Sequence, residues 1–197
     1  MDLTNWKWLN ESDLSVNGDE LVIYAPGHED WFCNPIPDAD GRLDEPVSGA
    51  PVLYTEVEGD FVLSAMVKPD HRSTYDACAL MVIENEKLWT KLAFEASDFG
   101  TNLICSVVTN GISDDCNGCD IGQAQVWLKL VRVGDIFSAH YSLDGEDYRM
   151  VRLFTLPVGS TVKVGIEAQC PTGEGGYRAF RDVRLEKRTV ENLRKGQ

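Results

Sequence analysis

From Val52 onward the sequence is a succession of short, mostly apolar runs, each ended by turn-forming residues. The pairs Gly134-Asp135 and Asp144-Gly145 are typical of tight hairpins. Short strands at regular spacing, with turns between them, indicate an antiparallel sandwich rather than a fold of alternating strands and helices. We expect strands near residues 52–57, 60–68, 76–84, 87–95, 102–109, 125–133, 136–143, 148–154, 161–169 and 177–187.

The ends of the chain extend this architecture. Residues 6–9, 14–17 and 20–25 form further short apolar segments, and a polar loop covers residues 35–51. Only residues 189–195 resemble a helix, because Thr189 can cap it and Glu191 lies in its first turn. A chain of 197 residues fits one β-sandwich, so we predict a single domain over residues 1–197 with a short C-terminal helix.

Charge and leader signals exclude several partners. The chain has 32 acidic and 18 basic residues, and a formal charge of −14 opposes binding to nucleic acid and to anionic membranes. The N-terminal residues resemble no secretory leader, so we expect a cytoplasmic protein whose six cysteines are mostly reduced. No glycine-rich phosphate loop precedes a helix, and no cofactor is predicted.

The run Trp89 to Glu95 alternates strictly between two faces. Leu92 and Phe94 are expected to enter the core, while Trp89, Lys91 and Glu95 share the opposite face. One interpretation is an ordinary solvated face, which antiparallel sheets commonly have. The other is a binding surface, favoured by Trp89, because an exposed indole is costly unless something covers or binds it.

Two motifs raise the question of metal binding. Residues 38–45 contain oxygen ligands suited to calcium, between Asp38 and Asp44, but lack the full spacing of a calcium loop. Cys116 and Cys119 have the spacing of half a zinc site, although no second pair is visible, and a redox disulfide is the alternative. We predict no metal site.

A series of motifs runs through nearly the whole chain in a fixed order. They are Asp30-Trp31-Phe32, Asn34-Pro35, Ala50-Pro51-Val52-Leu53-Tyr54, Gly59-Asp60-Phe61, Trp89-x-Lys91-x-x-x-Glu95, Val107 to Asp115, Arg132-x-Gly134-Asp135, Ser142-x-Asp144-Gly145, Met150-x-Arg152 and Val164 to Pro171. In these motifs the sequence resembles the domain of unknown function 1349, also called the "regulation of enolase" family. The resemblance implies a concanavalin A-like jelly roll of two antiparallel sheets, one with a concave face that forms a cleft. Legume lectins and laminarinase-type glucanases share that fold.

Strand alternation then nominates residues for the cleft. The candidate ligand-binding residues are Trp89, Lys91, Glu95, Thr109, Asp114, Arg132, His140, Ser142, Arg152 and Gln169. In this hypothesis Trp89 stacks on a sugar ring and the three cations donate hydrogen bonds. Three cations in an acidic protein indicate a ligand that carries a carboxylate or a phosphate.

Three functions remain open at this point. The first is lectin-like binding of a saccharide or a sugar-derived metabolite. The second is a regulatory interaction protein that contacts a metabolic enzyme, as the family name suggests. The third is a glycoside hydrolase or another carbohydrate-active enzyme with Glu95 as its catalytic residue, although the Glu-x-Asp-x-x-Glu strand of glucanases on this fold does not occur.

Overall fold

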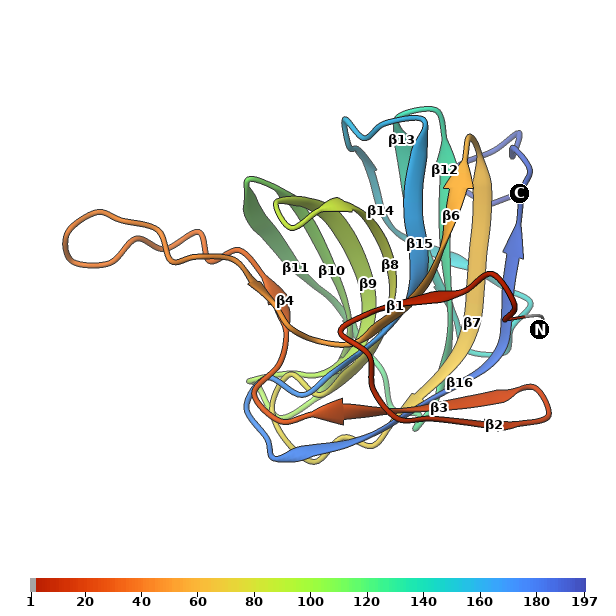
Figure 1. The fold of residues 1–197 in the computed structure, drawn as a ribbon. Helices are drawn as coiled ribbons and strands as arrows, with labels where there is room; N and C mark the ends of the chain where they lie inside the picture. The colour runs from red at the N-terminus through yellow and green to blue at the C-terminus, as the bar shows by residue number, and fades with distance from the viewer. Residues whose placement is uncertain (1–2) are drawn as a thin grey trace.

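Two large antiparallel sheets face each other in the computed structural model, which describes residues 3–197 (Figure 1). The front sheet contains, in order, β1 (Lys7–Leu9), β6 (Val52–Glu58), β15 (Thr161–Gln169), β8 (Ala77–Asn85), β9 (Leu88–Ala96), β10 (Asn102–Asn110) and β11 (Ile112–Asp120). The back sheet contains β14 (Arg149–Thr155), β13 (Ile136–Ser142), β12 (Val126–Val133), β7 (Phe61–Pro69), β16 (Gly175–Glu186), β3 (Glu20–Pro26) and β2 (Leu14–Asn17). This arrangement confirms the predicted sandwich.

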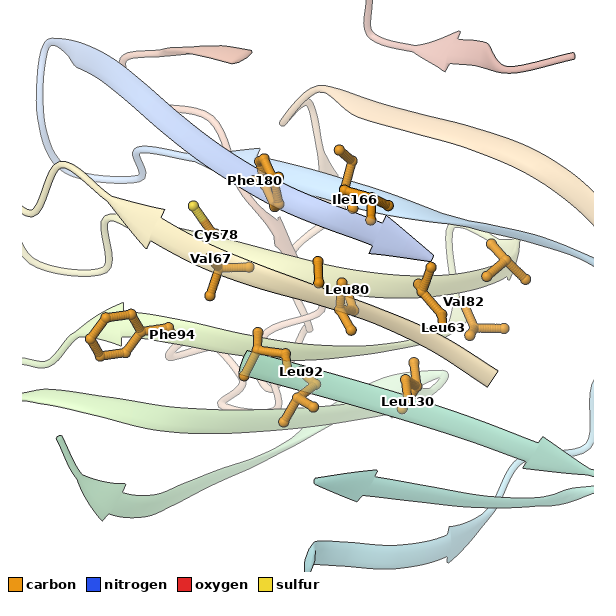
Figure 2. Packing of buried hydrophobic residues seen from close by; sticks show 14 of the residues in the cluster. Leu63, Val67, Cys78, Leu80, Val82, Leu92, Phe94, Leu130, Ile166 and Phe180 are labelled. Atoms are coloured by element: carbon orange, nitrogen blue, oxygen red, sulfur yellow. The ribbon is translucent and has the colours of Figure 1, made fainter. Parts of the chain in front are cut away.

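Apolar side chains fill the space between the sheets. Figure 2 shows Leu80 and Leu92 of the front sheet packed with Leu63 and Leu130 of the back sheet. Leu92 and Phe94 are fully buried in this core, as the alternation of β9 predicts. The opposite face of β9, with Lys91 and Glu95, therefore points away from the back sheet.

A second apolar layer covers part of that opposite face. Strand β4 (Trp31–Phe32) pairs with β5 (Val47–Ser48), and the segment between them projects from the sandwich as a long loop (Figure 1). The Trp31 ring packs edge-to-face on the Trp89 ring with a centroid distance of 6.1 Å. The concave face of the front sheet is thus partly closed by a segment from an earlier part of the chain.

The prediction of a C-terminal helix over residues 189–195 is wrong. Residues 187–197 contain a turn, a bend and irregular backbone but no helix. Val190 is buried against Val62 and Val131 of the back sheet, and Leu193 packs beside it. Docking of these side chains on the outer face of the back sheet outweighs the weak helix signals of Thr189 and Glu191. Within residues 3–197, no segment forms a helix of the length and apolar character that crossing a membrane requires.

Candidate functional site

A cavity of about 190 Å³ opens on the concave face of the front sheet, next to β4. Its lining comes from the β4 region, the loop before β8, and four strands: Asp30, Phe32, Tyr75, Lys91, Glu95, Cys105, Val107, Asp115 and Gln169. Strand register brings these residues together. Gln169, Ala77 and Glu95 form one cross-strand row, and Lys91, Val107 and Asp115 form another.

Small residues between the polar ones make this packing possible. Ala77 separates Gln169 from Glu95, and the Gln169 amide reaches across it to donate to Glu95 Oε2 at 3.2 Å. In the next row, Ala79 and Ala93 lie between Glu167 and Cys105. Directly opposed residues in an antiparallel sheet lie about 4.5–5.5 Å apart. The alanines therefore leave room for long polar side chains on their neighbours.

Lys91 is the cation at the centre of the cavity. Its Nζ donates to Asp30 Oδ1 at 2.8 Å, to the Trp31 carbonyl at 2.9 Å and to Gln169 Oε1 at 2.7 Å. Burial alone would lower the pKa of this ammonium, but the neighbouring carboxyl groups, with Asp30 first, outweigh burial and raise the pKa well above its usual range. Lys91 is therefore charged and has a partner for each of its three N–H groups.

Two buried carboxyl groups lie near Lys91. Burial raises the pKa of Glu95 to about 8 and that of Glu167 to about 7, although the Lys91 charge opposes both shifts. Both oxygens of Glu167 lack a hydrogen-bond partner within the described part of the chain. At neutral pH Glu95 consequently holds a proton most of the time and can both donate and accept hydrogen bonds.

Tyr75 forms part of the rim of the cavity. Its backbone φ is +68°, which is uncommon for a bulky side chain. In this conformation its N–H donates to the Ala96 carbonyl at 2.6 Å, and its carbonyl accepts from Gln169 Nε2 at 2.7 Å. Tyr75 is 38 % exposed and lines the cavity, so it offers an aromatic side chain at the rim. Sequence reasoning missed this residue because it lies just before the strand, where alternation assigns no face.

The structure corrects the role expected for two candidates. Trp89 is fully buried under Trp31, with its Nε1 donating to the Glu86 carbonyl at 3.1 Å, so it presents no face for stacking on a ligand. Thr109 is also buried, and its hydroxyl is hydrogen-bonded to Ser113 Oγ at 2.8 Å. Both residues share the face of the cavity residues, but β4 and the residues after it cover them.

Three other candidates, Arg132, His140 and Ser142, lie on β12 and β13 of the back sheet and do not line the cavity. Arg132 donates to the carbonyls of Gly134, Gly159 and Ser160. His140 and Ser142 lie on the outer face of β13, opposite the core residues of that strand. The expected convergence of these side chains with Lys91 was wrong, because alternation along a strand does not show to which sheet the strand belongs.

Arg152 and Asp114 form an ion pair with each other. Arg152 Nη2 lies 3.0 Å from Asp114 Oδ2, and Arg152 also donates to the Ser106 carbonyl. This pair joins the edge strands β14 and β11 outside the cavity. The neighbouring residue Asp115 faces the cavity, since it pairs with Val107 on the face that carries Lys91. Of the nominated residues, the structure brings together Lys91, Glu95 and Gln169, and it adds Asp30, Tyr75 and Asp115 among others.

The two motifs considered for metals have other roles. Asp38 Oδ1 accepts from the backbone N–H groups of Asp40 and Arg42, and Asp44 accepts from Asn34, so these carboxylates shape the loop. Cys116 is exposed on β11, whereas Cys119 packs against the core, and both are free thiols. Within residues 3–197, no group of three or more His, Cys, Asp or Glu side chains is placed to hold a metal ion.

Comparisons with known proteins agree with the fold. A family model described as "Protein of unknown function (DUF1349)" matches residues 8–188, and no curated protein matches the sequence. A functionally unknown protein from Saccharomyces cerevisiae is 24% identical, with a TM-score of 0.83, over 94% of this chain and 98% of that one. The carbohydrate-binding module CBM66 from Bacillus subtilis is 15% identical, with a TM-score of 0.59, over 93% and 96% of the two chains.

A GH43 protein from Bacillus licheniformis, BlXynB, is 14% identical with a TM-score of 0.58; the match covers 94% of this chain but only 39% of that one. Identities this low show the fold alone. The fold is the concanavalin A-like jelly roll that the family resemblance implies.

Proposed function

The chain belongs to the DUF1349 family of proteins of unknown function, and from its site we propose that it binds a small saccharide or a sugar-derived metabolite in the cavity of the front sheet. The observation that carries this proposal is the convergence of charged, amide and aromatic side chains from separate strands on one cavity. A few convergent polar groups in a concave pocket are the usual form of a small-molecule site. The structural similarity to a carbohydrate-binding module supports a sugar as the ligand.

The chemistry of the lining suits a polyol. Sugar hydroxyls need hydrogen-bond acceptors and donors, which Asp30, Glu95 and Asp115 supply, and sugar C–H groups pack on aromatic faces such as those of Phe32 and Tyr75. The cavity volume of about 190 Å³ is smaller than the roughly 300–1,000 Å³ of pockets for drug-sized ligands. This size favours one sugar ring, or the end of a chain, over an extended oligosaccharide.

Calorimetric titration tests the proposal with a panel of hexoses, pentoses, hexosamines and uronic acids. We expect saturable binding with one site per chain, accompanied by a rise in melting temperature, because a ligand of the native state stabilises it. Glu95→Gln should weaken the binding about tenfold or more, since it removes an ionisable group from the cavity. Glu191→Gln is the control, because Glu191 is an exposed carboxylate of the C-terminal segment. Equal weakening by both variants, or no binding of any sugar, would contradict the proposal.

Glycoside hydrolysis is the second candidate, supported by the pairing of two carboxyl groups in one cavity. Glu95 holds a proton near neutral pH, as a general acid must, and Asp115, which lines the same cavity, would act as the nucleophile or base. Turnover of chromogenic glycosides, lost in both Glu95→Gln and Asp115→Asn, would favour this function. Binding of the same glycosides without turnover would favour the lectin-like function. Contact with a metabolic enzyme stays a prediction.

A further inference from the structure

Carboxyl groups outnumber cations around the cavity. Asp30, Glu95 and Asp115 line it, and Glu167 lies on the same face of β15, two residues before Gln169. Lys91 is the one cation among the lining residues. The charge balance of the site therefore favours a ligand that brings positive charge.

The single cation has no hydrogen bond to offer a ligand. The three acceptors of Lys91 Nζ lie at 2.7–2.9 Å, and its side chain is only 3 % exposed. An ammonium group has three N–H donors, so these acceptors use all of them. A carboxylate or phosphate in the cavity would have to displace one of these partners.

The other groups behind the cavity are also paired. Gln169 accepts from Lys91 and donates to the Tyr75 carbonyl and to Glu95. The Nη2 atom of the fully buried Arg178 lies 2.7 Å from Asp76 Oδ1, and Arg178 Nε donates to the Gln169 carbonyl. Neither side chain is free to donate to an anionic ligand.

Unused hydrogen-bonding capacity belongs to the carboxyl groups instead. Glu167 is fully buried, and both of its oxygens lack partners within the described residues. Over residues 3–197, the Glu95 carboxyl receives a hydrogen bond only from Gln169. Buried acceptors without donors are costly, and a donor placed among them is correspondingly favourable.

We propose that the ligand of this cavity carries an ammonium group, as an amino sugar does, and that this ammonium binds between Glu95 and Asp115. Within this proposal, the sugar part of the ligand rests on the proposed function, whereas the ammonium rests on the charges of the lining. A carboxylate or phosphate on the ligand was expected from three converging cations, and that argument no longer holds because Arg132 and Arg152 lie outside the cavity.

Binding of an ammonium must be coupled to loss of a proton. The groups that face Glu95 from the packed strands and loops are Lys91, Asp30, Asp115, Glu167, Tyr75 and Cys105. A cationic ligand favours ionised Glu95, whereas the free protein keeps it protonated below a pKa of about 8. Affinity should therefore rise with pH, by up to about tenfold per unit, until pH 8 is reached.

The experiment compares matched ligands on the intact protein by calorimetric titration at pH 6, 7 and 8. The probes are glucosamine, galactosamine and mannosamine, the three parent hexoses, glucuronate and galacturonate, and the sugar-free amines putrescine and spermidine. We expect at least one amino sugar to bind about tenfold or more tightly than its parent hexose, with uronates weakest. This preference should shrink in Glu95→Gln and in Asp115→Asn but persist in the control Glu191→Gln.

The outcomes separate this inference from the proposed function. If a hexose or a uronate binds as tightly as every amino sugar, or more tightly, the proposal of an ammonium-bearing ligand is overturned. The proposal of saccharide binding is then unaffected. Binding of putrescine or spermidine without binding of any sugar overturns saccharide binding and supports the ammonium. If no probe binds, both the saccharide proposal and the ammonium proposal are overturned. If the affinity for amino sugars falls between pH 6 and pH 8, the ammonium proposal is overturned.

Discussion

The two sheets each have a polar face that points away from the core, and these faces are closed in different ways. On the front sheet, Lys91 and Glu95 lie beside β4, which covers part of the face and leaves a cavity. On the back sheet, His140 is hydrogen-bonded to Ser138 at 2.9 Å, and Gly196 of the C-terminal segment packs against the His140 ring. Lys91 and Glu95 are buried but still line a cavity, whereas the C-terminal segment covers His140. What covers a polar face, rather than its polarity, decides whether it can be a site.

The largest expected effect comes from comparing two single variants, each of which replaces one lysine, in the front sheet or in the back sheet. Lys91→Met should lower the free energy of unfolding by about 3–5 kcal/mol, because it leaves the buried carboxyl groups without their cation. Lys129→Met on the back sheet should cost about 1 kcal/mol or less, since the half-buried Lys129 ammonium lies 3.5 Å from the Tyr148 ring centroid and loses only a cation–π contact. Chemical denaturation of both variants measures the difference. Similar losses would remove the energetic distinction between the two faces.

The next test measures how folding stability depends on pH, because the buried groups of the two faces should change it in opposite directions. Burial raises the pKa of Glu95 from 4.5 to about 8, so its contribution is present below pH 4.5 and is lost as pH rises to about 8. Burial lowers the pKa of His140 from 6.5 to about 4, so its contribution is present above pH 6.5 and is lost as pH falls to about 4. Each effect should be on the order of a few kcal/mol.

Denaturation series from pH 4 to pH 9 separate these contributions. The double variant Glu95→Gln, Glu167→Gln should flatten the loss of stability that occurs as pH rises from about 4.5 to 8. His140→Gln should instead flatten the loss of stability that occurs as pH falls from about 6.5 to 4. Loss of both slopes in either variant would show that the two faces do not titrate independently.

A smaller effect is expected at the rim of the cavity. Tyr75→Ala keeps a side chain at a positive φ, whereas Tyr75→Gly relieves that strain, so the glycine variant should be about 1 kcal/mol more stable than the alanine variant. Both variants lose the exposed ring and should bind the ligand more weakly by a similar factor. Unchanged affinity in both would remove Tyr75 from the site.

The smallest effect is expected at the sheet edges. Arg152→Met breaks a partly exposed ion pair with Asp114 and should cost about 1 kcal/mol or less. Ligand affinity should not change, because this pair lies outside the cavity. An affinity loss as large as that of Glu95→Gln would mean that the site extends to the junction of β14 and β11.

The sequence predicts one strand face better than it predicts a site. Alternation places Leu92 and Phe94 in the core and Lys91 and Glu95 opposite them, and this is confirmed. Alternation cannot tell which strands become neighbours, so Arg132 and His140 were expected beside Lys91 although they belong to the other sheet. Nor can it tell what will cover a face, and Trp89 was therefore expected to be accessible. Asp30 and Tyr75 lie outside the long strands, where no periodic signal exists.

The hydrogen bonds of Lys91 also bear on how quickly a ligand can enter. They join β9 to Asp30 and Trp31, about sixty positions earlier in the chain, and so fix one wall of the cavity. An outward movement of that wall would remove two hydrogen-bond partners from the buried Lys91 ammonium, so such an opening is rare. Molecules must then pass through the existing mouth, and rapid-mixing traces should contain a single phase whose rate grows linearly with concentration.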